Sequence, residues 1–180
     1  MNRTASVTTL SPLATRTDAE IEAILDAAFG ADRHGRTAYA IRLGCAWLAD
    51  FSYAVSDDSG VLLGVLQSWP VELRCDDGNA TASLIMVGPV AILPENQGEG
   101  LGQLLMDRLC SDADVKADAP LMMIGDPEYY GRFWGFSAER TGGWRAPGPV
   151  EARRLLMRDV SGAPSLAPLS GMLAPRTGGR

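Results

Sequence analysis

Three glycines lie within five residues in the stretch LPENQGEGLGQLLMDRL, residues 93–109, where a helix is expected to begin. Glycine costs a helix about 1 kcal/mol per site relative to alanine, so Gly98, Gly100 and Gly102 need another explanation. The first turn of a helix presents free N–H groups and a partial positive charge, and glycine lets an anion approach that backbone closely. The pattern therefore suits a phosphate or pyrophosphate cradle, and equally a tight strand-to-helix turn that binds nothing.

Two common phosphate-binding motifs do not match this stretch. A P-loop needs GxxxxGK followed by Ser or Thr, and the stretch contains no Lys. The dinucleotide fingerprint GxGxxG needs a glycine three residues after Gly100, where Gln103 stands, and no acidic ribose partner is evident downstream.

Cysteine and histidine chemistry is weakly indicated. The cysteines are far apart, with no CxxC pair, and each has an apolar residue within two positions: Cys45, Cys75 and Cys110. They are expected to be small buried hydrophobic residues in a reducing compartment, so no metal site is predicted. His34, the single histidine, lies between two predicted helices and is expected to be solvated.

No residue of the sequence stands out as a general base, a group that would take up a proton. The strand segment SLIMVG, residues 83–88, contains no carboxylate. Glu72 and Glu95 are weak candidates for such a base, and deprotonation through water is as good an explanation.

The first half of the chain predicts a strand at 5–13, two helices and a hairpin. Thr17 and Glu20 form a capping box at the start of the first helix, and Gly30 is expected to end it. A second helix is expected at about 35–48, where Tyr39, Leu43 and Trp47 recur at helical spacing. The DDSG stretch then predicts a turn between two strands.

The second half predicts a long buried strand at 81–93, interrupted at Gly88–Pro89, where proline cannot donate to the ladder and a bulge or splay is expected. A helix with an apolar stripe follows the glycines, then a strand at 120–125, a short helix and turn at 125–136, and a last strand near 150–160. This order predicts an α+β fold with a mixed, mostly antiparallel central sheet flanked by helices. We expect one domain at 1–160 and an irregular Pro-, Gly- and Ala-rich tail at 161–180.

Composition limits the class of partner. The 180 residues carry a net charge of -6, and the pI is about 4.7. A nucleic-acid ligand is not expected, because phosphate backbones need clustered Lys and Arg. No apolar run has the length of a signal peptide or a membrane span, so we expect a cytoplasmic protein that does not interact with membranes.

Two motifs resemble the GNAT superfamily of N-acetyltransferases. Q-x-x-G-x-G, at Gln97, Gly100 and Gly102, follows a buried strand and opens an amphipathic helix, as in that family. GDPEYYGRFWGF, residues 125–136, is similar to the GDPxYYxRFGF stretch of the bacterial YhbS-like predicted acetyltransferases, with Trp134 as one extra residue. The motifs span residues 88–136, and the element order extends the resemblance over about 5–160.

The resemblance implies acetyl-CoA as the co-substrate. The strand edge at Val90, Ala91 and Ile92 would offer backbone groups to the pantetheine arm. The amides of the following loop would bind the pyrophosphate, from residues Gln97, Gly98, Glu99, Gly100, Leu101 and Gly102.

The resemblance also implies a catalytic tyrosine. Tyr130 is the expected donor of a proton to the departing thiolate, with Tyr129 as its rival, because adjacent helical residues point about 100° apart and only one can face the sulfur. Trp134 and Trp144 are expected mainly in the core, with an acceptor pocket as the alternative. An oxyanion-stabilising amide is expected near Val90 or Ile92. For removal of the proton from the acceptor, an amine that arrives neutral is as good an explanation as Glu72, Glu95 or water.

The predicted function is acetyl transfer from acetyl-CoA to an amine of a small molecule or peptide by direct attack. No Cys–His pair supports a covalent enzyme intermediate. The alternative is a catalytically silent acyl-CoA-binding sensor of the same fold, and transfer to oxygen or of a longer acyl chain is a third option. The acceptor stays open, and so does the choice between a monomer and a homodimer, since many relatives pair.

Overall fold

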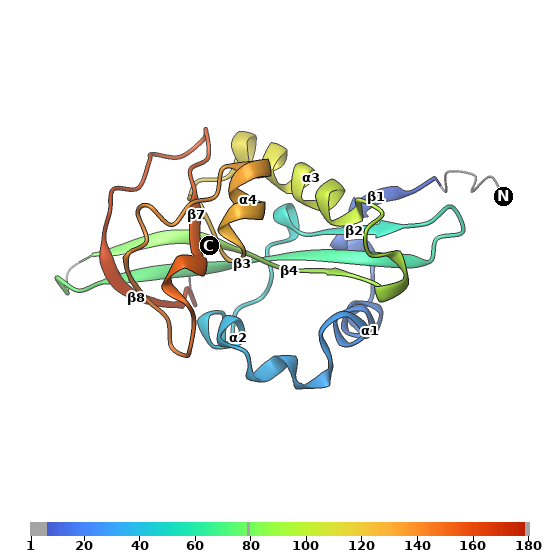
Figure 1. Cartoon of the computed structure of the whole chain (residues 1–180), viewed down its shortest axis with the longest axis horizontal. Helices are drawn as coiled ribbons and strands as arrows, with labels where there is room; N and C mark the ends of the chain where they lie inside the picture. Colours follow the sequence, from blue (N-terminus) through green and yellow to red (C-terminus); the bar gives the residue numbers. More distant parts are fainter. Residues whose placement is uncertain (1–6, 79, 179–180) are drawn as a thin grey trace.

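A computed structural model describes residues 7–78 and 80–178, which form a mixed eight-stranded sheet with helices on both faces (Figure 1). The main strand order is β1-β2-β3-β4-β5-β7, and β8 pairs with both β3 and β6. The pairs β4–β5 and β6–β8 are parallel and the others are antiparallel. The strands are β1 Thr9–Pro12, β2 Tyr53–Ser56, β3 Leu62–Cys75, β4 Thr81–Ile92, β5 Leu121–Ile124, β6 Gly143–Arg145, β7 Leu155–Arg158 and β8 Ser170–Pro175. The predicted α+β class is confirmed.

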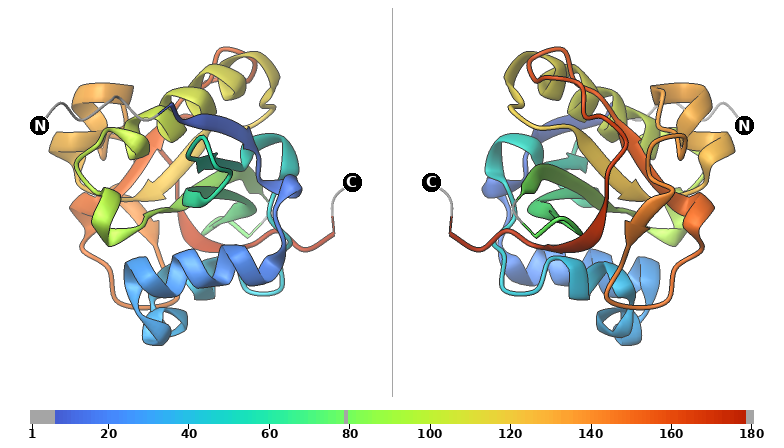
Figure 2. Two further views of the ribbon diagram at one scale, coloured as in Figure 1. Left: turned by 90° about the vertical axis from the view of Figure 1, so that its right-hand side faces the viewer. Right: turned by 90° about the vertical axis from the view of Figure 1, so that its left-hand side faces the viewer.

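The helices divide between the two faces of the sheet. Figures 1 and 2 show α1 and α2 on one face and α3 and α4 on the other. The α-helices are α1 Asp18–Phe29, α2 Thr37–Ile41, α3 Leu101–Lys116 and α4 Pro127–Trp134. Short 3₁₀ segments occur at Leu13–Thr15, Ala31–Gly35 (η2), Ala49–Phe51, Pro94–Asn96 and Ala152–Arg154 (η5). No helix of the described part of the chain is long and apolar enough to cross a membrane.

Local signals begin and end the first helix as predicted. The Thr17 side chain accepts a hydrogen bond from the Glu20 amide, and the Glu20 carboxylate accepts from the Thr17 amide at 2.8 Å. Gly30, at φ +85°, ends α1. Asp57 closes the predicted hairpin turn by accepting from the amides of Ser59 and Val61.

The hydrophobic core lies on both faces of the sheet. The largest cluster packs α3 against one face through Leu101, Leu105 and Leu109, which confirms the predicted apolar stripe. The opposite face carries two clusters, one under α1 and one that includes Ile41 of α2.

The predicted second helix at 35–48 is wrong beyond residue 41. The 3₁₀ segment η2 ends at Gly35, and α2 follows and ends at Ile41. Leu43 is 72% exposed, and Gly44 has φ +77°, which is not helical. The helical spacing in the sequence therefore does not mark a buried face here.

The prediction of an irregular tail is wrong over Ser170–Pro175, which forms β8. β2 pairs with the first half of β3, and β8 pairs with Val71–Cys75 in its second half. Strand β8 also pairs with β6, a strand that the sequence did not predict. Pairing with a long strand that would otherwise expose an edge orders a segment whose composition is typical of a loop.

Candidate active site

Strands β4 and β5 separate next to a bulge in β4. Their parallel pairing covers Ile85 with Leu121 and Met86 with Met122 only, although both strands continue further. On the other side of β4, the pairing with β3 shifts by one residue between Leu66 and Ser68, opposite Gly88–Pro89. The interruption predicted at this dipeptide is therefore present.

The bulge reverses which residues of β4 face each side. Before it, Leu84 and Met86 pack in the cluster that includes Ile41. After it, Ala91 packs under α1, whereas Val90 and Ile92 pack toward the α3 cluster. One extra residue thus changes the parity of the strand.

The open edge of β4 presents the backbone of Val90 and Ile92. The Leu93 amide donates to the Leu63 carbonyl of β3, and successive backbone groups of a strand point to opposite edges. Ala91 therefore points toward β3, where it pairs with Val65 and is fully buried. Among the three residues predicted here, Val90 and Ile92 face the gap and Ala91 does not.

The glycines of the loop differ in why a side chain is absent. Gly98 and Gly100 have φ values of +83° and +81°, a conformation that side chains disfavour. Gly102 lies inside α3 with no positive φ, and a Cβ there would meet no atom within 4 Å. Neither backbone conformation nor packing explains the glycine at 102, which leaves open space beside the first turn of the helix.

The other predicted loop residues serve the loop itself in this structure. The Gln97 side chain donates to the Ile92 carbonyl at 3.3 Å, which connects the loop to the end of β4. Glu99 is exposed and accepts from the Asn96 side chain at 3.2 Å. The Leu101 side chain is buried in the core under α3.

The two tyrosines of α4 occupy different environments. Tyr130 is half-buried and lines a cavity, and burial raises the pKa of its hydroxyl, with a smaller contribution from Tyr129. Tyr129 is 38% exposed and is not among the residues that line this cavity. A Cβ at Gly125 would lie 2.7 Å from the Tyr130 ring, so the glycine at the end of β5 provides the room for that ring.

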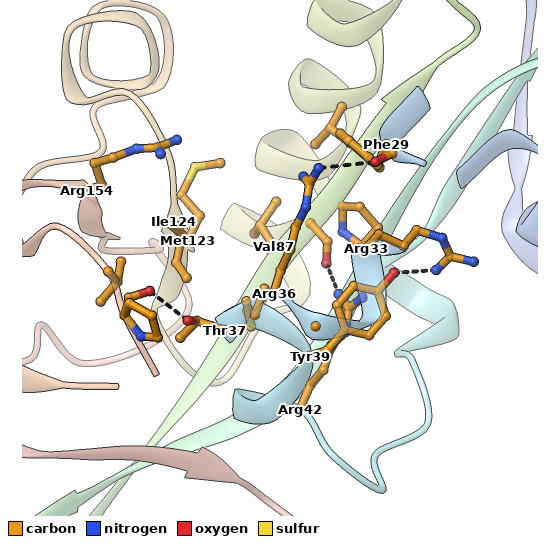
Figure 3. A pocket seen from close by; sticks show the side chains of 18 of the residues that line it. Phe29, Arg33, Arg36, Thr37, Tyr39, Arg42, Val87, Met123, Ile124 and Arg154 are labelled. Carbon is orange, nitrogen blue, oxygen red and sulfur yellow. Dashed lines mark hydrogen bonds between the residues drawn. The ribbon is translucent and has the colours of Figure 1, made fainter. Parts of the chain in front are cut away.

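The cavity, of about 890 Å³, connects the gap in the sheet with the face that carries α2 (Figure 3). Strands β4 and β5 supply Val87, Gly88, Pro89, Val90, Met123 and Ile124 to its wall. The segment from the end of α1 to α2 and the loop at 149–154 supply the remaining sides. A group held between β4 and β5 would therefore meet a second molecule that enters from the α2 side.

Four arginines and one carboxylate line the cavity: Arg33, Arg36, Arg42, Arg154 and Glu151. Arg33 is buried in ion pairs with Glu22 and with Asp26, the latter at 2.9 Å. None of these arginines was predicted as a site residue from the sequence, although Arg33, Arg36 and Arg42 lie within ten residues of an acidic chain.

Arg42 is 5% exposed and lies between two aromatic rings. Its guanidinium carbon is 4.1 Å from the centroid of the Tyr39 ring and 4.3 Å from that of Trp69. Its Nη1 donates to the Gly88 carbonyl at 2.9 Å, and Trp69 Nε1 donates to the same oxygen at 2.9 Å. Two donors thus hold the bulge of β4 from the α2 side. Burial lowers the pKa of Arg42 to about 10.

Several residues considered from the sequence lie outside the cavity wall. Glu72 pairs with Arg74 on β3, and Glu95 is exposed beyond the end of β4. His34 is exposed beside Tyr39 and is not a lining residue. Trp134 and Trp144 are buried in core clusters, which confirms the expectation that they lie mainly in the core. Within residues 7–78 and 80–178, no group of three or more His, Cys, Asp or Glu side chains is arranged to hold a metal.

Solved structures share this architecture. The GNAT family N-acetyltransferase YhbS from Escherichia coli, in complex with CoA, is 19% identical, with a TM-score of 0.65 and 91% of each chain covered. A GNAT family acetyltransferase from Brucella melitensis, in complex with acetyl-CoA, is 25% identical, with a TM-score of 0.52. The match covers 87% of this chain and 98% of that chain. A GCN5-related N-acetyltransferase from Kribbella flavida is 16% identical, with a TM-score of 0.53, over 76% of this chain and 34% of that chain.

No protein-family model and no curated protein matches the sequence. The structural likeness extends over nearly the whole length of the first two proteins. The chain has the GNAT fold, and the resemblance predicted from its loop and α4 motifs is confirmed at the level of that fold.

Proposed function

We propose that this protein binds acetyl-CoA between β4 and β5 and transfers the acetyl group to an amine. The observation that carries the proposal is the open edge of β4, which leads directly into a loop with an unfilled space beside Gly102. The complexes of the E. coli protein with CoA and of the Brucella protein with acetyl-CoA support it.

The residues present fit such a ligand. Val90 and Ile92 turn backbone groups toward the gap, where an extended arm can add to the sheet like a strand. The first turn of α3 offers free amides and a partial positive charge to phosphates. At Gly102 a side chain would take up the space that a phosphate needs, and there the chain has none.

The proposed acyl transfer uses groups that lie in or beside the cavity wall. Acetyl-CoA supplies a thioester: the amine nitrogen bonds to the acyl carbon, the carbon–sulfur bond breaks, the nitrogen loses a proton and the sulfur gains one. An amide of Val90 or Ile92 is placed to stabilise the negative charge that develops on the acyl oxygen. Tyr130, whose raised pKa keeps its hydroxyl protonated near neutral pH, is proposed to protonate the sulfur.

Within the described cavity wall, Glu151 is the one carboxylate that could take a proton from the amine. It is exposed, so it can act directly or through water. An amine that arrives neutral needs no base before it attacks, and its nitrogen loses one proton after the bond to the acyl carbon has formed. The arginine-rich wall favours that neutral form over an ammonium ion.

A calorimetric titration with CoA, followed by a thiol-release assay with acetyl-CoA and a panel of amines, tests the proposal. We expect saturable binding and a thermal shift, about 2.7 kcal/mol of stabilisation at a hundredfold excess over Kd. Absence of heat and of a thermal shift at millimolar CoA would contradict it.

The second candidate is a silent acyl-CoA sensor, because β4 carries no carboxylate beside the bulge. Binding of acetyl-CoA without thiol release from any amine of the panel would favour it. Thiol release that Tyr130→Phe reduces while CoA binding is retained would favour the enzyme.

A further inference from the structure

The α2 side of the cavity carries positive charge that Glu151, the one carboxylate of the described wall, offsets only in part. Arg36, Arg42 and Arg154 line the wall, and none of them is in an ion pair with a described residue. Arg33 differs, because Glu22 and Asp26 neutralise it. In a chain of net charge -6, three arginines outside ion pairs thus line one cavity.

Each of the three arginines is held by neutral groups. Arg36 donates to the Phe29 carbonyl at 3.2 Å and lies 5.3 Å from the centroid of the Phe29 ring. Arg154 donates from Nε to the Gly125 carbonyl at 3.4 Å, and Arg42 is held as described above. These contacts orient the guanidinium groups without forming an ion pair.

The three side chains have distinct positions. Arg36 and Arg154 are exposed and come from opposite walls, the first from the start of α2 and the second from η5 (Figure 3). Arg42 is buried at the back, against the bulge of β4. Two accessible guanidinium groups are available for a ligand, and the buried one adds to the positive field that the ligand meets.

The rest of the wall limits the kind of anion. Apolar side chains occupy much of it, including Phe29, Met86, Ile124, Pro149 and Val150. An apolar body with one singly charged group fits this mixture better than a phosphate ester. Arginine binds a carboxylate through paired hydrogen bonds of fixed geometry.

We propose that the acceptor is an amine that bears a carboxylate on an apolar body, the chemical class of apolar amino acids, with Arg36 and Arg154 binding the carboxylate. This inference rests on the proposed function, because it concerns the second substrate of the same site. The acceptor would then place its amine toward Val90 and Tyr130, at the gap between the strands.

The products of the reaction make suitable probes. N-acetyl-leucine, N-acetyl-methionine and N-acetyl-phenylalanine differ from their carboxamides only in the charged group, and no member of the panel has a basic amine. We expect each acid to bind at least tenfold more tightly than its carboxamide in calorimetric titrations at low salt, with and without CoA.

Variants locate the effect. Arg36→Gln and Arg154→Gln should each reduce the preference for the acid at least threefold and leave the affinity for the carboxamide unchanged. Arg153→Gln is the matched control, because Arg153 adjoins Arg154 in η5 but pairs with Glu128 and does not line the cavity. It should leave the preference unchanged.

Equal affinity for acids and carboxamides, binding of neither, a preference that survives both variants, or tighter binding of phosphoethanolamine would overturn the inference. A separate titration with CoA distinguishes this failure from that of the proposed function. If CoA does not bind, the proposed function fails. If CoA binds and the acids show no advantage, only the acceptor class fails.

Discussion

The indole Nε1 of Trp134 donates a hydrogen bond of 2.8 Å to the Asp107 carboxylate, which joins the end of α4 to α3. Trp134 is the residue by which the α4 motif exceeds the family stretch that it resembles. It is 8% exposed, and its ring packs against the rings of Tyr130 and Phe133. The extra residue therefore serves packing between the two helices and does not enter the cavity.

Trp134→Phe should destabilise the protein by about 1 to 2 kcal/mol, because it removes this hydrogen bond and part of the buried ring. Denaturant unfolding of the variant, of Asp107→Ala and of the double variant measures the effect. The two changes should be less than additive, because they remove the same bond. Full additivity would show that the bond contributes nothing.

Gly102→Ala should stabilise the fold by up to about 1 kcal/mol, because alanine is the better helix former and its Cβ meets no atom. The same change should weaken CoA binding about tenfold if the space beside Gly102 holds a phosphate. Thermal unfolding and calorimetry on one sample measure both. Gly100→Ala is the comparison, and it should destabilise the fold by about 1 to 2 kcal/mol because of the φ of +81°. If Gly102→Ala leaves the affinity for CoA unchanged, the phosphates of CoA do not occupy the space beside Gly102.

Tyr130→Phe should lower kcat about 10² to 10⁴-fold with little change in the Kd of CoA, as expected for loss of a general acid. Tyr129→Phe should have no effect on kcat, because this side chain does not line the cavity. The larger loss in Tyr129→Phe would transfer the proposed role to that residue.

The pH dependence of kcat gives an independent check on Tyr130. The donor is active in its protonated form, which is populated below its pKa, and burial raises that pKa above the usual value near 10. The wild-type rate should therefore show no alkaline decline due to this residue up to about pH 10. A decline centred near pH 8 that disappears in Tyr130→Phe would contradict the assignment.

The two donors on the Gly88 carbonyl predict an interaction between Arg42 and Trp69. Arg42→Gln and Trp69→Phe should each cost about 1 to 2 kcal/mol of unfolding free energy, since one donor remains in each. Trp69→Phe keeps an aromatic ring beside the Arg42 guanidinium, which contacts the Trp69 ring in the wild type. The double variant should therefore lose more than the sum, because no donor then remains. Simple additivity in urea unfolding would show that the shared carbonyl is not the link.

The pair of Asp114 and Arg158 should make part of the unfolding free energy depend on pH. The Arg158 guanidinium binds it with two hydrogen bonds, of 3.0 and 2.8 Å, and holds the pKa of this carboxyl below its usual value. The folded state therefore binds the proton less readily than the unfolded chain. This stabilisation is present above about pH 4, the ordinary value for Asp, and is lost as the pH falls through the folded pKa.

Urea unfolding of wild type and Asp114→Asn between pH 7 and pH 3 measures this contribution. The difference in stability between the two proteins should shrink toward the acid end. A constant difference would mean that the carboxylate does not titrate with folding.

Local signals in the sequence predicted much of the fold correctly. The capping box at Thr17, the turn at Asp57, the bulge at Gly88–Pro89 and the apolar stripe of α3 depend on residues close in the chain, so their patterns are legible. The helix expected at 35–48 ends at Ile41, because apolar residues at helical spacing do not by themselves show that another element covers that face. β8 was missed because its order comes from pairing with β3 and β6, about a hundred and about thirty residues away.

The sequence by itself determined where the glycines lie, that a buried strand breaks at Gly88–Pro89, and that a tyrosine pair follows the fifth strand. The tertiary structure decided the rest: Tyr130 rather than Tyr129 lines the cavity, Val90 and Ile92 rather than Ala91 face the gap, and Arg36, Arg42 and Arg154 come from separate segments to line one cavity. These choices depend on strand parity after the bulge and on which elements pack together. Such relations join residues far apart in the chain, and no local pattern encodes them.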